Sequence, residues 1–213
     1  DKDFKFDWNV RSITIQSGFT VDLKDWIYIN NAFSHLCEVI IEPGNQRYQF
    51  SNDFLLYKSK EDVNDFDTLI FASKDINKAI IPPQVTKICD YAFNNCKSLR
   101  NIEFYSKINN ISIGKYAFQS SSIETIIFPS QVTLIDDFAF FDCKYLQRVE
   151  VYNNDNSLLS YSSSSSPKHI IKAGKDIFYK CGNLKEIILP ENVEIQSVSN
   201  NDSSHHIQSP IEE

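Results

Sequence analysis

Hydrophobic and polar residues alternate over five short runs of the chain that share one spacing. Each run reads aliphatic, two variable residues, Ile or Val, one variable residue and an apolar residue. The runs start at Leu36, Leu99, Ile123, Leu146 and Leu184. Alternation with a period of two predicts a short strand with one buried face in each run. Successive runs begin 63, 24, 23 and 38 residues apart, so the pattern predicts stacked repeats of about 23 residues, with insertions in the first and last intervals.

A phenylalanine precedes each of the last four runs, and three of the four follow an alanine. These residues are Phe93, Phe118, Phe140 and Phe178. Because equivalent strands stack about 4.8 Å apart, we expect the four rings to form one continuous column. The residues around each ring lack alternation and predict a short helical turn. The segments "QVTKI" (84–88) and "QVTLI" (131–135) predict a second strand in the coil.

Two long segments carry this pattern most completely. They are "IIPPQVTKICDYAFNNCKSLRNIEF" at 80–104 and "IIFPSQVTLIDDFAFFDCKYLQRVEV" at 126–151. Their order of Pro, Val-Thr, Ala-Phe, Cys, Leu and Ile or Val resembles the BspA-like leucine-rich repeat, found in surface antigens of host-associated anaerobic bacteria and parasitic protists. The resemblance implies an α/β leucine-rich-repeat solenoid of about five coils. It also implies a cell-surface or secreted, adhesin-like antigen that contacts host or extracellular-matrix protein.

The organisation of the chain follows from where the pattern is interrupted. We expect the solenoid to span 1–196 and a polar tail to span 197–213. The runs between 43 and 84 predict a β-hairpin insertion, in which 48–50, 54–57, 68–71 and 79–81 form a meander. A Ser-rich stretch without periodicity predicts a loop at 153–169.

Composition and charge narrow the function. The net charge of −7 and the pI near 5.1 argue against a nucleic-acid partner, because phosphates require a basic face. No apolar run approaches the roughly 20 residues of a membrane helix, so we expect no membrane insertion within this segment. The five glycines stand too far apart for a phosphate loop or a nucleophile elbow. The chain starts at Asp1 and has no Met, which indicates a mature or excised piece.

Three cysteines recur at one position of the coil, three residues ahead of a run: Cys96, Cys143 and Cys181, with Ser120 at that place in the remaining coil. They could form a metal or disulfide cluster, or a column of small buried side chains. The second interpretation is favoured, since Cys96 and Cys143 lie two rungs apart, about 10 Å, too far for a disulfide. Neither the cysteines nor the four histidines form a catalytic or metal-binding motif. We therefore expect no enzyme activity, no metal and no cofactor.

Two N-glycosylation sequons are present, at Asn110-Ile-Ser112 and at Asn201-Asp-Ser203. Asn201 lies in the predicted tail and is the more accessible of the two. Asn110 lies near an inward-facing column and is the weaker candidate.

The outward face of the stacked strands is the remaining candidate for a binding surface. Its central line is Ile40, Glu103, Ile127, Glu150 and Ile188, flanked by Arg148 and by the aromatic residues Tyr105 and Tyr152. Three outward aliphatic residues that alternate with two acids beside two tyrosines are unusual for a purely solvating face, and solenoids generally bind through such extended surfaces. The alternative is that these residues are only cross-strand packing pairs.

Two functions fit these observations. The first is a non-enzymatic protein-binding module of the surface-antigen kind that the resemblance implies, whose ligand is a protein. The alternative is an intracellular, cytoplasmic scaffold that uses the same surface, which free thiols and an acidic pI favour.

Overall fold

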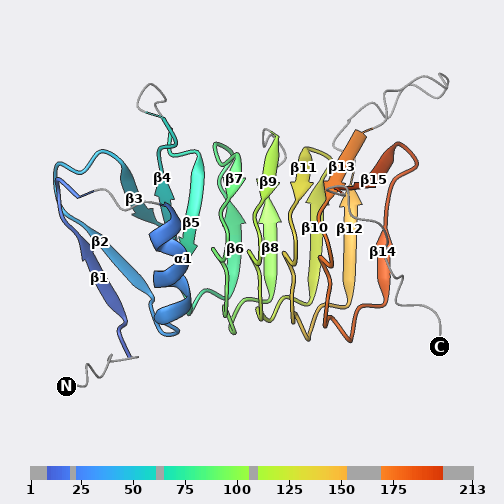
Figure 1. Cartoon of the computed structure of the whole chain (residues 1–213), viewed down its shortest axis with the longest axis horizontal. Coiled ribbons are helices and arrows are strands. Elements are labelled where there is room, and N and C mark those ends of the chain that lie inside the picture. Colours follow the sequence, from blue (N-terminus) through green and yellow to red (C-terminus); the bar gives the residue numbers. More distant parts are fainter. Residues whose placement is uncertain (1–8, 20–22, 61–64, 106–109, 153–168, 199–213) are drawn as a thin grey trace.

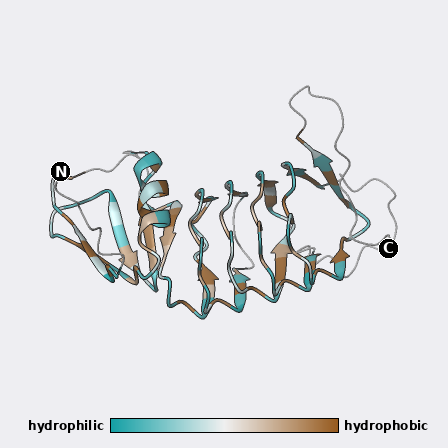
Figure 2. Cartoon of the chain, turned by 60° about the horizontal axis from the view of Figure 1, so that its bottom comes forward, coloured by the Kyte–Doolittle hydropathy of each residue, from teal (hydrophilic) through white to brown (hydrophobic). Residues whose placement is uncertain are grey.

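The computed structural model describes residues 9–19, 23–60, 65–105, 110–152 and 169–198 of the 213-residue chain. The chain winds as an elongated solenoid, in which strands of successive coils lie side by side along the long axis (Figure 1). Hydrophobic segments recur in each successive coil (Figure 2). The predicted α/β leucine-rich-repeat solenoid is therefore confirmed, although the described residues contain one helix only.

One parallel sheet contains the predicted strands of the repeat. Its order is β14-β12-β10-β8-β6. The strands are β6 (Lys78–Ile81), β8 (Asn101–Phe104), β10 (Thr125–Pro129), β12 (Arg148–Tyr152) and β14 (Glu186–Ile188). Ile102 and Phe104 of β8 are buried, whereas Glu103 between them is exposed, as the alternation predicts. The solenoid has about seven turns rather than the predicted five or so, and β6 stands in this sheet in place of the run that begins at Leu36.

The second sheet has eight strands, in the order β15-β13-β11-β9-β7-β5-β4-β3. The strands are β3 (Tyr48–Ser51), β4 (Phe54–Tyr57), β5 (Thr68–Ala72), β7 (Lys87–Ile88), β9 (Ile111–Ile113), β11 (Val132–Ile135), β13 (His169–Ala173) and β15 (Val193–Ser197). The pairs from β5 to β15 are parallel, and β3, β4 and β5 pair antiparallel. β7 and β11 confirm the second strand predicted from "QVTKI" and "QVTLI".

Segments 89–96, 114–121, 136–143 and 174–181 cross between the two sheets as turns rather than as the helical turns that we predicted. Each holds two non-glycine residues in the left-handed region, for example Tyr91 at φ 59° and Asn95 at φ 58°. This backbone aims alternate N–H groups at the next coil: the amide of Phe93 donates to the carbonyl of Ala117 (2.7 Å), and that of Phe118 donates to Ala139 (2.8 Å). The coil-to-coil hydrogen bonds replace the bonds that a helix would have made within one coil.

The predicted phenylalanine column lies inside these turns. The ring centroids of Phe93 and Phe118 are 4.8 Å apart, those of Phe118 and Phe140 4.9 Å, and those of Phe140 and Phe178 5.6 Å. Phe93, Phe118 and Phe140 are fully buried, as are the alanines before them, which leave room for the neighbouring coils to approach. Phe178 is half-buried and follows the bulkier Ile177.

The N-terminal unit consists of residues 9–60 and has its own architecture. It contains β1 (Ser12–Ile15), α1 (Leu23–Ala32) and β2 (Glu38–Ile41), followed by the β3–β4 hairpin. β1 and β2 form a separate two-stranded parallel sheet. Trp26 of α1 packs with Tyr48 and Phe71 in a second core. α1 has ten residues, and no helix in the described part of the chain is long and apolar enough to cross a membrane.

The hairpin predicted over 43–84 is antiparallel only in its first part. β3, β4 and β5 form the expected meander, but β5 also pairs in parallel with β7 (Leu69 opposite Ile88). β6 lies in the other sheet, where Ala79 and Ile81 are buried in register with Ile102 and Phe104. The last strand predicted for the insertion therefore belongs to the regular coils, which begin inside the predicted insertion.

The boundaries of the predicted loop and tail also differ. His169 begins β13 and Ser197 ends β15, so both are strand residues. The rest of the predicted loop 153–169, and residues 199–213 of the predicted tail, lie outside the described residues.

Candidate functional site

The outward face of the five-stranded sheet, called the strand face from here on, has an aliphatic and acidic central row. Strand register aligns Ile80 with Glu103, Ile127 with Glu150, and Glu150 with Ile188. Ile80, Ile127 and Ile188 are 44%, 41% and 39% exposed. Three branched aliphatic side chains therefore project from one continuous sheet at intervals, an arrangement that a purely solvating face does not require.

Ile40 does not belong to this row, contrary to the prediction. It lies on β2, opposite Thr14 of β1, in the separate two-stranded sheet. Its place is taken by Ile80, which the sequence analysis assigned to the hairpin. A signal for this was available: Ile76 stands 23 residues ahead of Leu99, and Ile81-Pro82 repeats the apolar-Pro step that ends other strands.

The acidic residues of the strand face are neutralised by basic neighbours on the same sheet. Lys78 lies 2.8 Å from the carboxylate of Glu103. Arg148 lies 2.7 Å from Glu150 and 2.9 Å from Glu186, and these carboxylates raise the pKa of its guanidinium. Because each acid is paired, the row offers a partner less negative charge than the sequence alone suggests.

The two tyrosines flank this row at the ends of their strands. Tyr105 follows β8 directly and is 52% exposed. Tyr152 ends β12 opposite Pro129, is half-buried, and has a pKa raised by burial. Tyr105 is thus the more available of the two for contact with a partner.

The cysteines form the predicted packing column, with Ser121 rather than Ser120 at the remaining position. The thiols of Cys143 and Cys181 donate to the carbonyls of Phe118 and Phe140, each at 3.0 Å. Ser121 Oγ lies 3.4 Å from Cys143 Sγ. All five cysteines are free, and no three Cys, His, Asp or Glu side chains of the described residues form a cluster that could hold a metal ion.

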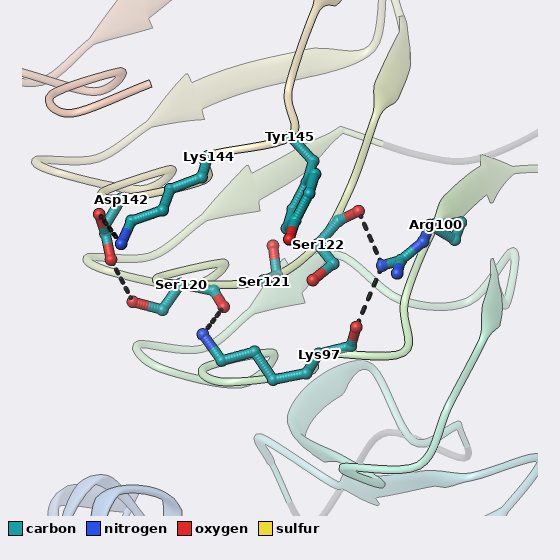
Figure 3. A pocket seen from close by; sticks show the side chains of 8 residues that line it. All are labelled: Lys97, Arg100, Ser120, Ser121, Ser122, Asp142, Lys144 and Tyr145. Carbon is teal, nitrogen blue, oxygen red and sulfur yellow. Dashed lines mark hydrogen bonds and ion pairs between the residues drawn. The ribbon is translucent and has the colours of Figure 1, made fainter. Parts of the chain in front are cut away.

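A hollow that the sequence analysis missed opens where strands β8, β10 and β12 begin (Figure 3). We call it the notch; its volume is about 340 Å³. It is lined by Lys97, Arg100, Ser120, Ser121, Ser122, Asp142, Lys144 and Tyr145. No motif indicated it, because its residues come from three successive coils and meet only in the folded chain.

The two sequons differ in what can be said of them. Asn110 is exposed, although its neighbour Ile111 is fully buried in the inward column. The hydroxyl of Ser112 lies 3.5 Å from the carbonyl of Thr86. Asn201 lies outside the described residues.

Known proteins share this repeat architecture. A model of the BspA type leucine rich repeat region matches residues 64–193 in six copies. A leucine-rich repeat protein from Eubacterium ventriosum has a similar structure, with 21% identity, a TM-score of 0.60, and coverage of 87% of this chain and 50% of that one. The pneumococcal vaccine antigen PcpA is 17% identical, with a TM-score of 0.49. The match covers 90% of this chain and 52% of that one. The chain thus spans about half the length of these relatives, and no curated protein matches it.

Proposed function

The chain belongs to the family of proteins with the BspA type leucine-rich repeat, and from this premise we propose that it is a non-enzymatic protein-binding module of an adhesin-like surface antigen. The module acts at the cell surface or in secreted form and contacts a host or extracellular-matrix protein. Its binding surface is the strand face, with Tyr105, Tyr152 and Ile127 as anchors.

The observation that carries the proposal is the exposure of Ile80, Ile127 and Ile188 in one row of a continuous sheet. Exposed aliphatic side chains gathered on one face with a polar margin are typical of interaction sites. Binding energy in such sites concentrates in a few aromatic or large residues. Tyr105 supplies an exposed ring beside the row, and the ion pairs of Lys78 and Arg148 supply the polar margin.

The location follows from the resemblance of the repeats to those of surface antigens. Five free cysteines are the observation that favours the alternative, an intracellular scaffold with the same binding surface. Both functions use the strand face, so one set of variants tests that surface and the location is tested separately, by fractionating the producing cells.

The test is binding of the chain to immobilised collagen, laminin and fibronectin, measured by surface plasmon resonance. Replacing Tyr105 and Tyr152 by Ala removes both aromatic anchors, and we expect it to abolish binding while leaving the melting temperature nearly unchanged. The matched control replaces two tyrosines outside the strand face, Tyr28 on α1 and Tyr179 in the last turn, which are 74% and 53% exposed. This control should bind like the unmodified chain.

The electrostatic part of the proposal has its own variants. Glu103→Lys with Glu150→Lys places like charges beside Lys78 and Arg148, and should slow association with a basic partner and reduce its salt dependence. If this double variant and the tyrosine double variant both bind as the unmodified chain does, the strand face is a packed sheet only. The binding surface would then have to be sought on the 43–84 segment.

A further inference from the structure

The notch exists because one coil is shorter than its neighbours. Phe93 and Leu99 are six residues apart, as are Phe140 and Leu146, whereas Phe118 and Ile123 are five apart. The shorter coil also carries three consecutive serines, 120–122, where the coil before it has Asn-Cys-Lys and the coil after it has Asp-Cys-Lys. A missing residue and small side chains leave a gap between two coils of full length. Side chains from both neighbours line that gap (Figure 3).

Three of the eight lining residues are basic and one is acidic, so the lining is net positive although the whole chain carries a net charge of −7. The ammonium group of Lys97 donates to the carbonyl of Ser120 at 2.6 Å, which occupies one of its three N–H groups. Lys144 is 72% exposed, and its ammonium lies 3.7 Å from the carboxylate of Asp142. Both lysines therefore have donors left for an anionic group placed between them.

Two further side chains of the notch, Ser122 and Tyr145, are available for contact with a ligand. Ser122 is 4% exposed and lines the notch, where its hydroxyl can donate or accept a hydrogen bond (Figure 3). The ring of Tyr145 is 54% exposed, and the guanidinium of Arg100 lies 5.6 Å from its centroid.

Arg100 has a positioning role in the notch rather than a binding one. Its guanidinium donates to the carbonyls of Lys97 and Ser122 and pairs with Glu124 at 3.4 Å. These bonds tie the coil of full length to the short one. They hold the backbone at Ser122 and support the face of Tyr145, so the site is built before a ligand arrives.

From this arrangement we propose that the notch binds a sugar that carries a carboxylate, the acidic unit of a glycan. The sugar carboxylate lies between Lys97 and Lys144, and the C–H face of the ring packs on Tyr145. Sugar hydroxyls donate to Asp142 and form hydrogen bonds with the hydroxyl of Ser122. The volume of about 340 Å³ is at the lower end of ligand pockets and fits one or two sugar rings.

The lining favours a sugar over other anions because it offers acceptors and an aromatic face as well as positive charge. A free inorganic anion would use the lysines but would leave Tyr145 without contact and would bring no hydroxyl donor to Asp142. An ionised acidic side chain of a peptide likewise brings no hydroxyl donor to Asp142. A sugar acid contacts both lysines, Asp142 and Tyr145, since its hydroxyls are donors and acceptors together.

Isothermal titration calorimetry at low ionic strength tests the proposal with three probes: methyl glucuronide, the methyl glycoside of sialic acid, and methyl glucoside as the uncharged match of the first. At least one acidic sugar should bind, and methyl glucoside should bind at least about tenfold more weakly. Tyr145→Ala should weaken binding of the acidic sugar roughly tenfold, and Ser122→Ala roughly three- to tenfold. Lys144→Gln removes one of the two ammonium groups that hold the sugar carboxylate and should weaken binding of the acidic sugar. Lys185→Gln, at an exposed lysine outside the notch, is the charge-matched control and should leave that binding unchanged.

A second, independent test lengthens the short coil by one residue. Inserting one lysine after Ser121 gives the short coil the length of its neighbours, so the protein should fold and lose sugar binding. The Tyr105 and Tyr152 double variant should retain sugar binding, and Tyr145→Ala should retain protein binding, which separates this proposal from the proposed function. Equal binding of acidic and neutral sugars, binding of acetate as tight as that of the acidic sugar, or no binding of any sugar would overturn the proposal.

Discussion

In the regular coils, residues 76–193, Phe93, Phe118 and Phe140 stack with nearly parallel rings, at interplanar angles of 18° and 4°. In the N-terminal unit, Trp26 meets Tyr48 and Phe71 with tilted rings, at 53° and 35°. The core of the coils repeats one Phe–Phe contact from coil to coil. The core of the N-terminal unit is built from contacts between different aromatic residues, each of which occurs once. The surroundings of a coil residue are thus largely made by copies of that residue in the coils on either side.

The comparison extends to how each region meets its neighbour. A regular coil continues into the next through backbone bonds at the turns and through two parallel sheets. The N-terminal unit meets the coils through the antiparallel pair of β4 with β5 and through side chains, as where the amide of Asn30 donates to the carbonyl of Ile70 at 3.1 Å in a buried position. Because the hydrophobic cores of the two regions are separate clusters, damage to the N-terminal core should stay more local than damage to the core of the coils.

The largest expected effect comes from breaking the ring column at its centre. Phe140 is fully buried between Phe118 and Phe178, so Phe140→Ala opens a cavity bordered by both neighbours and should cost roughly 3–5 kcal/mol in the free energy of unfolding. Urea unfolding measures it. Phe178→Ala, at a half-buried site at the end of the column, is the control and should cost clearly less. Equal costs for the two variants would mean that the column does not act as a continuous stack.

Trp26→Ala makes the corresponding change in the N-terminal core. Trp26 is 2% exposed, and its indole N–H is buried without a partner among the described residues, so its removal also relieves an unsatisfied donor. We expect a cost near 3 kcal/mol, at the lower end for a buried tryptophan. Hydrogen exchange should show lost protection in residues 9–57 and unchanged protection in β9 and β11. Uniform loss of protection along the chain would contradict the separation of the two cores.

These contrasts explain what the sequence could predict. Phe93, Phe118 and Phe140 recur once in each coil, 25 and 22 residues apart, so the pattern revealed both their burial and their stacking. Ile80 was missed because the turn before β6 lacks the Ala-Phe and Cys of the repeat, and Ile40 was misplaced because a strand pattern does not say which sheet the strand joins. The notch was invisible for a related reason: a single deleted residue before Ile123 has consequences only when Lys97 and Lys144 stack on either side of it.

Close packing between coils gives the next effect in size. A Cβ added to Gly114 would contact the carboxylate of Asp90 and lie 2.7 Å from its amide nitrogen, whereas nothing lies within 4 Å of a Cβ added to Gly182. Gly114→Ala should therefore cost about 1–3 kcal/mol, because coil backbones must separate. Gly182→Ala, at an open position of the last coil, should cost less than about 1 kcal/mol. Thermal and urea unfolding of both variants give the comparison, which fails if Gly114→Ala is as stable as Gly182→Ala.

The smallest expected effect is the pH dependence of stability that arises from one buried thiol in each core. Cys89 lies in the core of the N-terminal unit and Cys96 in that of the coils, and burial raises the pKa of each from 9.0 to about 11. Above pH 9 the unfolded chain releases these protons before the folded chain does, so stability is fully present below pH 9 and falls as the pH rises toward 11. The loss by pH 9.5 should be on the order of 1 kcal/mol.

The matched control for this titration is the double variant Cys89→Ala with Cys96→Ala. Burial lowers the pKa of Lys74, and a lowered lysine pKa adds stability as the pH rises, which opposes the thiols. The double variant retains Lys74, so the difference in unfolding free energy between it and the unmodified chain reports the two thiols together with the interaction of Cys96 with Lys74. As the pH rises, ionisation of the two thiols lowers the unfolding free energy of the unmodified chain but not that of the double variant. The difference in unfolding free energy between the two proteins should therefore narrow with rising pH. A difference independent of pH between 8 and 10 would mean that neither core shields its thiol.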